Sequence, residues 1–179
     1  MGGFIEAVKA VLMFRPKSET GFDASRFSWT YAAIGIAFVA LLQAASLTVA
    51  FIGEPGVTAG VIADLSLVAA LALAVPFVLV TATAVLTRRQ DRLPAALLFV
   101  AVYLALMQIA LYLLSFFLPA SGSTITVVMA LTCYLSAKNV LGLPTGKALL
   151  VGAAVAIASF STGFLLLALP TGQAMLAAG

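Results

Sequence analysis

The chain has 179 residues, of which 64% are hydrophobic and 8% are charged, with a formal net charge of +3. A soluble domain carries about 25% charged residues, so this composition excludes a soluble globule with an ordinary polar surface. The chain has no histidine and one cysteine, Cys133, which excludes an intrachain disulfide and nearly excludes a metal site built from Cys and His.

The first 27 residues are predicted to form a cytoplasmic amphipathic segment. Its apolar side chains recur at helical spacing, with Ile5 beside them: Phe4, Val8, Val11 and Leu12. The pattern predicts a helix of about three turns, too short to cross a bilayer, which we expect to lie in the membrane interface. Pro16 is expected to end this helix.

Long apolar runs fill the rest of the chain and predict an all-α fold, a polytopic bundle of five transmembrane helices. The predicted spans cover residues 28–52, 60–86, 94–118, 124–141 and 147–169. Together they form one membrane domain over residues 28–170, and residues 171–179 make a short external tail. Pro76 is expected to kink the second span, where neighbouring helices can satisfy the freed backbone carbonyl.

The basic residues occur only in the N-terminal segment, in the second loop and at the two span ends that flank the fourth connection. They are Lys9, Arg15, Lys17 and Arg26 in the N-terminal segment, Arg88, Arg89 and Arg92 in the second loop, and Lys138 and Lys147 around the fourth connection. The positive-inside rule then predicts a cytoplasmic N-terminus and an external C-terminus, in a bacterial cytoplasmic membrane. We interpret this basic rim as a topology determinant that contacts anionic lipid headgroups. A docking surface for an acidic partner is the alternative.

Two amides are predicted to lie at similar depth in the membrane, Gln43 in the first span and Gln108 in the third. Both spans run in the same direction, and each amide follows the start of its span by about 15 residues. We expect a hydrogen bond between them that holds the two spans together. The functional alternative is a polar lining for a permeation path.

Asp64 is the acidic residue that could lie within a span. The interpretation that we favour is a helix cap, with the second span then beginning at residue 65. The alternative is an intramembrane carboxylate, which would suggest a proton or cation site.

Small residues form a stripe at helical spacing on the fifth span: Gly152, Ala156, Ser159 and Gly163. Such residues let helix backbones approach closely, so the stripe predicts a packing face. The pattern leaves open whether this face packs within the chain or against a partner.

The sequence gives no positive sign of an enzyme. No His or acidic residue lies near Cys133, and no Gly-rich phosphate loop, paired carboxylates or metal-ligand cluster is evident. We therefore expect a non-enzymatic protein without a cofactor. Basic and aromatic residues are not interleaved, which argues against a nucleic-acid partner. The expected partners are membrane lipids and other integral membrane proteins or a second copy of the chain.

Two stretches resemble the Yip family of five-span membrane proteins, in particular its short prokaryotic members. "FIEAVKAVLMFRPKS" precedes the first span, and "LGLPTGKALLVGAAVAI" joins the fourth span to the fifth. The matching positions are Phe4, Val8, Leu12 and Pro16 in the first, and Gly142, Gly146, Lys147 and Ala148 in the second. The second stretch contains LPTG at 143–146, which recurs at 169–172, and in both copies Pro and Gly are expected to mark a helix boundary because Gly permits a positive φ.

The resemblance implies a non-enzymatic integral membrane protein. Eukaryotic members are linked to Rab GTPases through a long polar N-terminal region, and only 27 residues precede the first span here. We therefore expect a membrane scaffold or an accessory subunit of a larger membrane complex, acting by helix packing and a basic cytoplasmic face. The alternative is a small transporter or oligomeric channel that uses Asp64, Gln43 and Gln108. Five spans cannot divide into the two equal inverted halves of many transporters.

Overall fold

The computed structural model describes residues 2–12, 27–51, 58–115 and 122–170, and the residues within these ranges form helices and turns without strands. The α-helices are α1 (Gly2–Leu12), α2 (Trp29–Phe51), α3 (Ala59–Leu86), α4 (Leu93–Ser115), α5 (Gly122–Leu135) and α6 (Thr145–Ala168). A 3₁₀ turn, η2 (Gln90–Arg92), precedes α4, and a π-helix, η3 (Ser136–Val140), extends α5. Arg15, Lys17, Pro16 and the tail at 171–179 lie outside the described residues.

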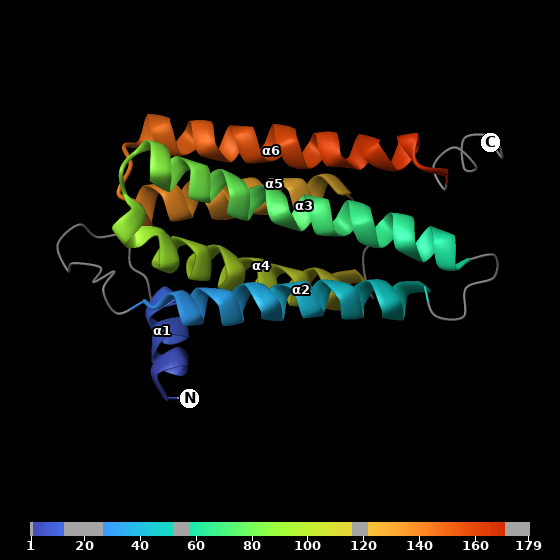
Figure 1. Ribbon diagram of the computed structural model, residues 1–179, viewed down its shortest axis with the longest axis horizontal. Coiled ribbons are helices and arrows are strands. Elements are labelled where there is room, and N and C mark those ends of the chain that lie inside the picture. The colour runs from blue at the N-terminus through green and yellow to red at the C-terminus, as the bar shows by residue number, and fades with distance from the viewer. Residues whose placement is uncertain (1, 13–26, 52–57, 116–121, 171–179) are drawn as a thin grey trace.

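The helices α2 to α6 lie side by side, and successive helices run in opposite directions (Figure 1). The most extensive contacts join α5 to α6, α2 to α4 and α3 to α6. The short helix α1 lies crosswise at one end of this bundle and packs against α4. The same end carries the α3–α4 connection and the turn between η3 and α6. We call this end, made by α1, residues 87–92 and residues 138–147, the basic end.

Four of the described helices are long and apolar enough to cross a membrane. These segments are Trp29–Val49, Ala59–Leu86, Gln90–Leu114 and Thr145–Thr162, and a shorter apolar helix covers Ile125–Val140. Their length and composition indicate an integral membrane protein. The predicted all-α fold is thus confirmed, and its helix boundaries agree within a few residues, whereas four of the five predicted spans correspond to described helices of spanning length.

The fourth predicted span is the one that falls short, because regular α-helix stops at Leu135. The chain then continues as the π-helix to Val140, where the Leu141 amide donates to the carbonyl oxygen of Ser136 at 3.1 Å. From Gly122 to Val140 the two segments would extend about 28 Å at 1.5 Å per residue. That length is close to the roughly 30 Å thickness of a hydrocarbon core.

Short polar side chains link α5 and its extension η3 to three neighbouring helices. The Ser136 hydroxyl donates to the Ala96 carbonyl of α4 at 3.2 Å, and the Cys133 thiol points at the Pro76 carbonyl of α3 at 4.0 Å. On α6, the Ser159 hydroxyl lies 3.8 Å from the sulfur of Met129. All of these side chains are buried, and bonding to a neighbour's backbone is a recurrent way for membrane helices to pack.

The turn into α6 agrees with the predicted helix boundary but uses a different glycine. Gly142 adopts a positive φ of 67°, which a residue without a Cβ takes at little cost. Gly146 instead lies inside the first turn of α6, which begins at Thr145. LPTG at 143–146 therefore marks a helix boundary as predicted, whereas the positive φ falls on Gly142 rather than on Gly146.

The amphipathic N-terminal helix forms as predicted, over Gly2–Leu12, with a slightly rotated buried face. Ala7 and Val11 are buried, whereas Ile5 and Leu12 are exposed. The Phe4 ring packs edge-on against Tyr31 of α2, with ring centroids 5.9 Å apart. These contacts hold α1 across the end of the bundle.

Candidate functional site

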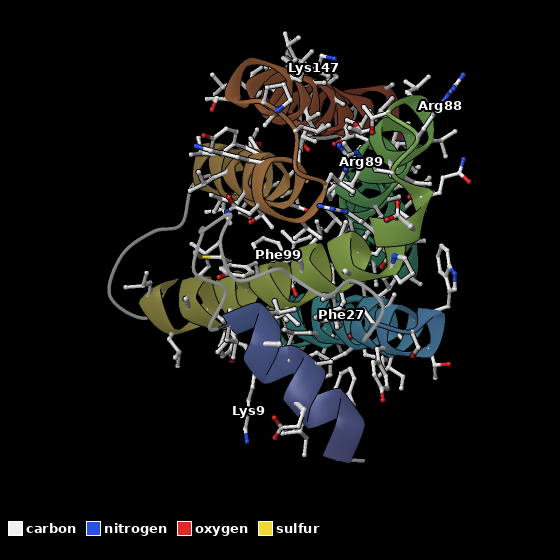
Figure 2. All side chains as sticks on the ribbon, turned by 90° about the vertical axis from the view of Figure 1, so that its left-hand side faces the viewer. Lys9, Phe27, Arg88, Arg89, Phe99 and Lys147 are labelled. Carbon is white, nitrogen blue, oxygen red and sulfur yellow. The ribbon has the colours of Figure 1, made fainter. Side chains whose placement is uncertain are left out.

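The basic side chains described by the structure gather at the basic end (Figure 2). Arg88 and Arg89 come from the α3–α4 connection, and Lys147 comes from the first turn of α6. Lys9 lies on α1, on the opposite side of this end from Lys147. The sequence placed these residues on the same side of the membrane, and the fold brings their elements to one end of the bundle.

The end of α3 positions Arg88 in an unusual backbone conformation. The Arg88 amide donates to the Val85 carbonyl at 3.1 Å and the Arg89 amide to the Ala84 carbonyl at 2.8 Å, which is the Schellman pattern. In that pattern the residue in the left-handed region is usually Gly or Asn, yet here it is Arg88, with φ of 57°. Left-handed backbone costs a residue with a Cβ about 1–2 kcal/mol.

The Arg92 side chain is partly buried and links two segments of the basic end by a hydrogen bond. Its Nη1 donates to the Val140 carbonyl at 3.3 Å, which joins the α3–α4 connection to the end of the π-helix. A Cβ at Gly142 would lie 3.2 Å from the same Nη1, so a larger residue here would have to shift the Arg92 guanidinium slightly, besides adopting the positive φ. Asp91 lies 3.8 Å from Arg92 Nε. Sequence reasoning counted Arg92 in the rim but could not show this bond, which spans 48 residues of sequence.

Lys138 and Lys9 make local contacts. Lys138 lies in the π-helix, where its Nζ donates to the Tyr134 hydroxyl at 3.2 Å and sits 5.6 Å from the centre of that ring. Lys9 pairs with Glu6 at 3.1 Å on the exposed side of α1. An exposed pair of this kind contributes little to stability.

The two amides predicted to meet do meet. Gln108 Nε2 of α4 donates to Gln43 Oε1 of α2, a contact of 2.5 Å across one of the most extensive helix interfaces in the bundle. Gln108 Oε1 is buried and has no hydrogen-bond partner among the described residues. The pair therefore holds α2 and α4 together but leaves one polar atom unsatisfied.

The Gln43–Gln108 bond predicts a measurable coupling between the two side chains. In a double-mutant cycle of Gln43→Leu and Gln108→Leu, we expect an interaction free energy of about 0.6–2 kcal/mol in thermal unfolding. Gln43→Leu alone is expected to cost more than Gln108→Leu alone, because it leaves the whole buried amide of Gln108 unpaired. Additive single-mutant effects would contradict the pairing.

Asp64 does not cap α3, so the favoured interpretation was wrong. The helix begins at Ala59, and its N-cap is Thr58, whose hydroxyl oxygen accepts from the Val61 amide at 3.4 Å. Apolar residues follow Thr58 directly and continue the helix, which places Asp64 in its second turn. There it is a half-buried carboxylate inside a helix of membrane-spanning length.

The small-residue stripe of α6 packs against α5 of the same chain. A Cβ at Gly152 would lie 3.1 Å from the Ala130 carbonyl oxygen and 3.2 Å from Tyr134 Cβ. Ser159 reaches Met129 of the same helix. The stripe thus has a partner within the chain, although the surroundings of Gly163 lie outside what the structure describes.

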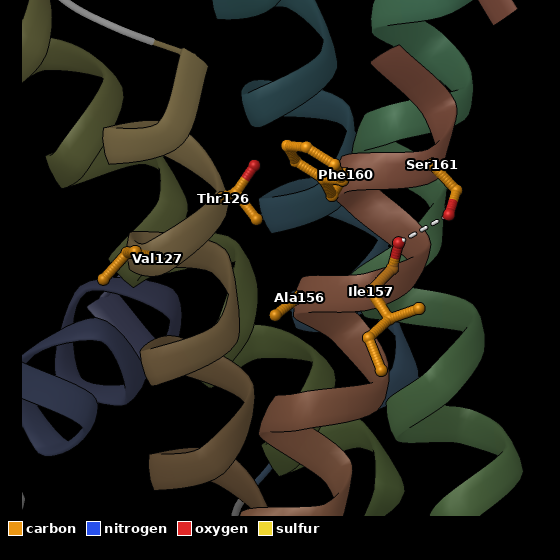
Figure 3. A pocket seen from close by; sticks show the side chains of 6 residues that line it. All are labelled: Thr126, Val127, Ala156, Ile157, Phe160 and Ser161. Atoms are coloured by element: carbon orange, nitrogen blue, oxygen red, sulfur yellow. Dashed lines mark hydrogen bonds between the residues drawn. The ribbon is translucent and has the colours of Figure 1, made fainter. Parts of the chain in front are cut away.

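Beyond this contact, α5 and α6 diverge and leave an apolar groove of about 410 Å³ (Figure 3). Thr126 and Val127 line it from α5, and Ala156, Ile157, Phe160 and Ser161 line it from α6. The Ser161 hydroxyl donates to the Ile157 carbonyl at 2.8 Å, so it is already satisfied by its own helix. The groove therefore presents apolar surface suited to lipid chains or an apolar helix.

A second groove, of about 260 Å³, lies where α1 crosses α2 and α4, and sequence reasoning missed it. Its lining is apolar throughout and includes Val8, Gly35, Phe38 and Ala105. Gly35 is closely packed there, since a Cβ would lie 3.0 Å from a Leu98 methyl. The sequence signal for this groove is a lone glycine in an apolar span, which does not identify a site on its own.

Comparisons with protein-family models, with curated proteins and with solved structures find no match to this chain. The basic end, the paired amides and Asp64 are thus the features on which a function can be based.

Proposed function

We propose that this protein is a non-enzymatic integral membrane scaffold or accessory subunit that acts through its basic end. In this proposal the chain crosses the membrane five times, with α5 and η3 together as the fourth span. The basic end faces the cytoplasm, in a bacterial cytoplasmic membrane, and the C-terminus lies outside. The resemblance of the N-terminal stretch and of the turn before α6 to the Yip family agrees with this assignment.

One observation carries the proposal, the collection of basic side chains at one end of an otherwise apolar bundle. Arg88, Arg89 and Lys147 come from two connections that are far apart in sequence, and they lie at the end of the bundle that α1 crosses on its other side (Figure 2). Lys138 lies in η3, next to the second of these connections. Such a face is suited to contact with headgroups and with partner proteins at the membrane surface. The apolar grooves beside α1 and between α5 and α6 offer further surface for membrane partners.

The experiment that tests this function is purification of the full chain from native membranes in a mild detergent, followed by identification of its partners. The scaffold proposal expects a stable complex that contains a larger membrane protein. In a matched preparation, Arg88→Glu with Arg89→Glu should weaken that complex, whereas Lys9→Glu should affect it less. Recovery of the chain free of any other membrane protein would count against the proposal.

The five-span arrangement predicts that the C-terminus is external. In a Cys133→Ser background, Gly179→Cys is expected to react in intact cells with a membrane-impermeant maleimide. A cysteine introduced at Lys147 should react only after the cells are opened, because its connection faces the cytoplasm. Equal protection of both positions would instead favour an even number of spans.

The alternative function is a small transporter or oligomeric channel that uses Asp64, Gln43 and Gln108. Two observations favour keeping it: Asp64 lies inside α3 rather than at its cap, and Gln108 Oε1 is buried without a partner among the described residues. Buried polar groups in membrane helices often mark ion or substrate pathways. Loss of a measured flux in liposomes on Asp64→Asn would support this alternative over the scaffold.

A further inference from the structure

We propose that the ends of α3 and α6 bind one anionic phospholipid, with its phosphate on Arg88 and Lys147 and an acyl chain on the leucines below. The inference deepens the proposed function and rests on its membrane orientation, since it assigns a lipid partner to one side of the basic end.

The first support is the placement of positive charge directly above exposed apolar surface. Arg88 and Lys147 are both exposed at the basic end. Leu86, two residues before Arg88, is 83% exposed, and Leu150, three residues after Lys147, is 71% exposed. α3 and α6 pack against each other, so the two charges and the two leucines come from neighbouring helices at the same end of the bundle. A phospholipid has the same order, an anionic phosphate followed by apolar chains.

The local charge balance also favours an anion. Residues 87–92 and 138–147 contain five basic residues and one acidic residue, Asp91, whose carboxylate lies beside Arg92. An acidic protein could be attracted by the same charges. It would not need a band of exposed leucine adjoining them, whereas a lipid would, so the combined surface favours the lipid.

The backbone at Arg88 supplies a further argument. This residue occupies the left-handed position of a helix end, where Gly or Asn would be less strained, and it directs a long cationic side chain away from the bundle (Figure 2). Strained backbone is often found where a side chain serves binding rather than stability. A cation that orients a phosphate would explain why an arginine stands here.

The test is native mass spectrometry of the purified full chain, with phosphatidylglycerol and phosphatidylcholine as probes. We expect one phosphatidylglycerol to remain bound under conditions that remove phosphatidylcholine. Arg88→Asn, which suits a left-handed backbone, and Lys147→Gln should each weaken this binding about fivefold, and the two together about thirtyfold. Inorganic phosphate should not displace the lipid, because it lacks the acyl chain.

Lys9→Gln is the matched control, since it removes one positive charge on the opposite side of the basic end. It should leave the bound phosphatidylglycerol nearly unchanged. If Lys9→Gln lost as much bound phosphatidylglycerol as Arg88→Asn, the proposed site would be wrong, because the binding would reflect diffuse attraction to positive charge. Equal retention of phosphatidylglycerol and phosphatidylcholine would also contradict it. So would displacement of the phosphatidylglycerol by inorganic phosphate. The measurement uses the chain alone, so a negative result would contradict the lipid site without contradicting the scaffold function, which is tested by the partner purification. Conversely, a lipid bound as expected would not depend on finding a partner protein.

Discussion

Replacing Phe99 by alanine is expected to lower the free energy of unfolding by about 3 kcal/mol. The ring is 1% exposed in the middle of the bundle and stacks on Tyr103, with centroids 4.4 Å apart. In a membrane the unfolded helices also lie in an apolar medium, so little of this cost is transfer from water. It comes from the cavity left between closely packed helices and from the dispersion contacts that are lost.

The loss of stability in Phe99→Ala can be measured by the reactivity of the buried Cys133 thiol. It is the one cysteine in the chain and is fully buried, so a thiol-reactive dye should report the loss of packing on heating. Phe160→Ala is the matched control, because Phe160 is 60% exposed and its ring packs edge-on against Phe164 of its own helix. We expect that control to cost less than about 1 kcal/mol. Similar losses for both variants would show that Phe99 is not a packing centre.

Replacing Gly152 by valine is expected to push α5 and α6 apart and to destabilise the bundle by about 2–3 kcal/mol. The new Cβ alone would lie 3.1 Å from the Ala130 carbonyl oxygen, and a backbone atom cannot move aside as the end of a side chain can. The two further methyl groups of valine increase the clash. The same dye assay, read from the neighbouring Cys133 of α5, should show earlier exposure of the thiol.

Gly146→Val is the control for this substitution. Gly146 lies in the same helix, but no described atom lies within 4 Å of the position that a Cβ would take. Valine has a better helix propensity than glycine, so this variant should be neutral or slightly more stable. If Gly146→Val lost as much stability as Gly152→Val, the loss would come from replacing a helical glycine as such. It would then give no evidence for close packing of α5 against α6.

The membrane character of the chain and the placement of its basic residues were predictable from the sequence. Both depend on local properties, namely the length of apolar runs and the position of charges relative to them. The pairing of Gln43 with Gln108 was also predictable, because two amides at equal depth in parallel spans have few other partners in hydrocarbon. The α1 helix followed from the 3.6-residue periodicity of its apolar side chains.

Other features depended on tertiary structure. The cap of α3 was assigned to the wrong residue, because Asp64 and Thr58 are both good caps and a local sequence pattern does not decide between them.

The arrangement of the helices, the packing of the small-residue stripe against α5 and the Arg92–Val140 bond came from the fold alone. In helices that are apolar on nearly every side, hydrophobicity does not say which face meets which neighbour. That choice is made by close steric fit, as at Gly152, and by single polar contacts such as Ser136 to Ala96. The sequence by itself therefore determined that the chain is helical and apolar, with its basic residues on one side. The tertiary structure decided which of these basic residues lie close together and which contact the backbone.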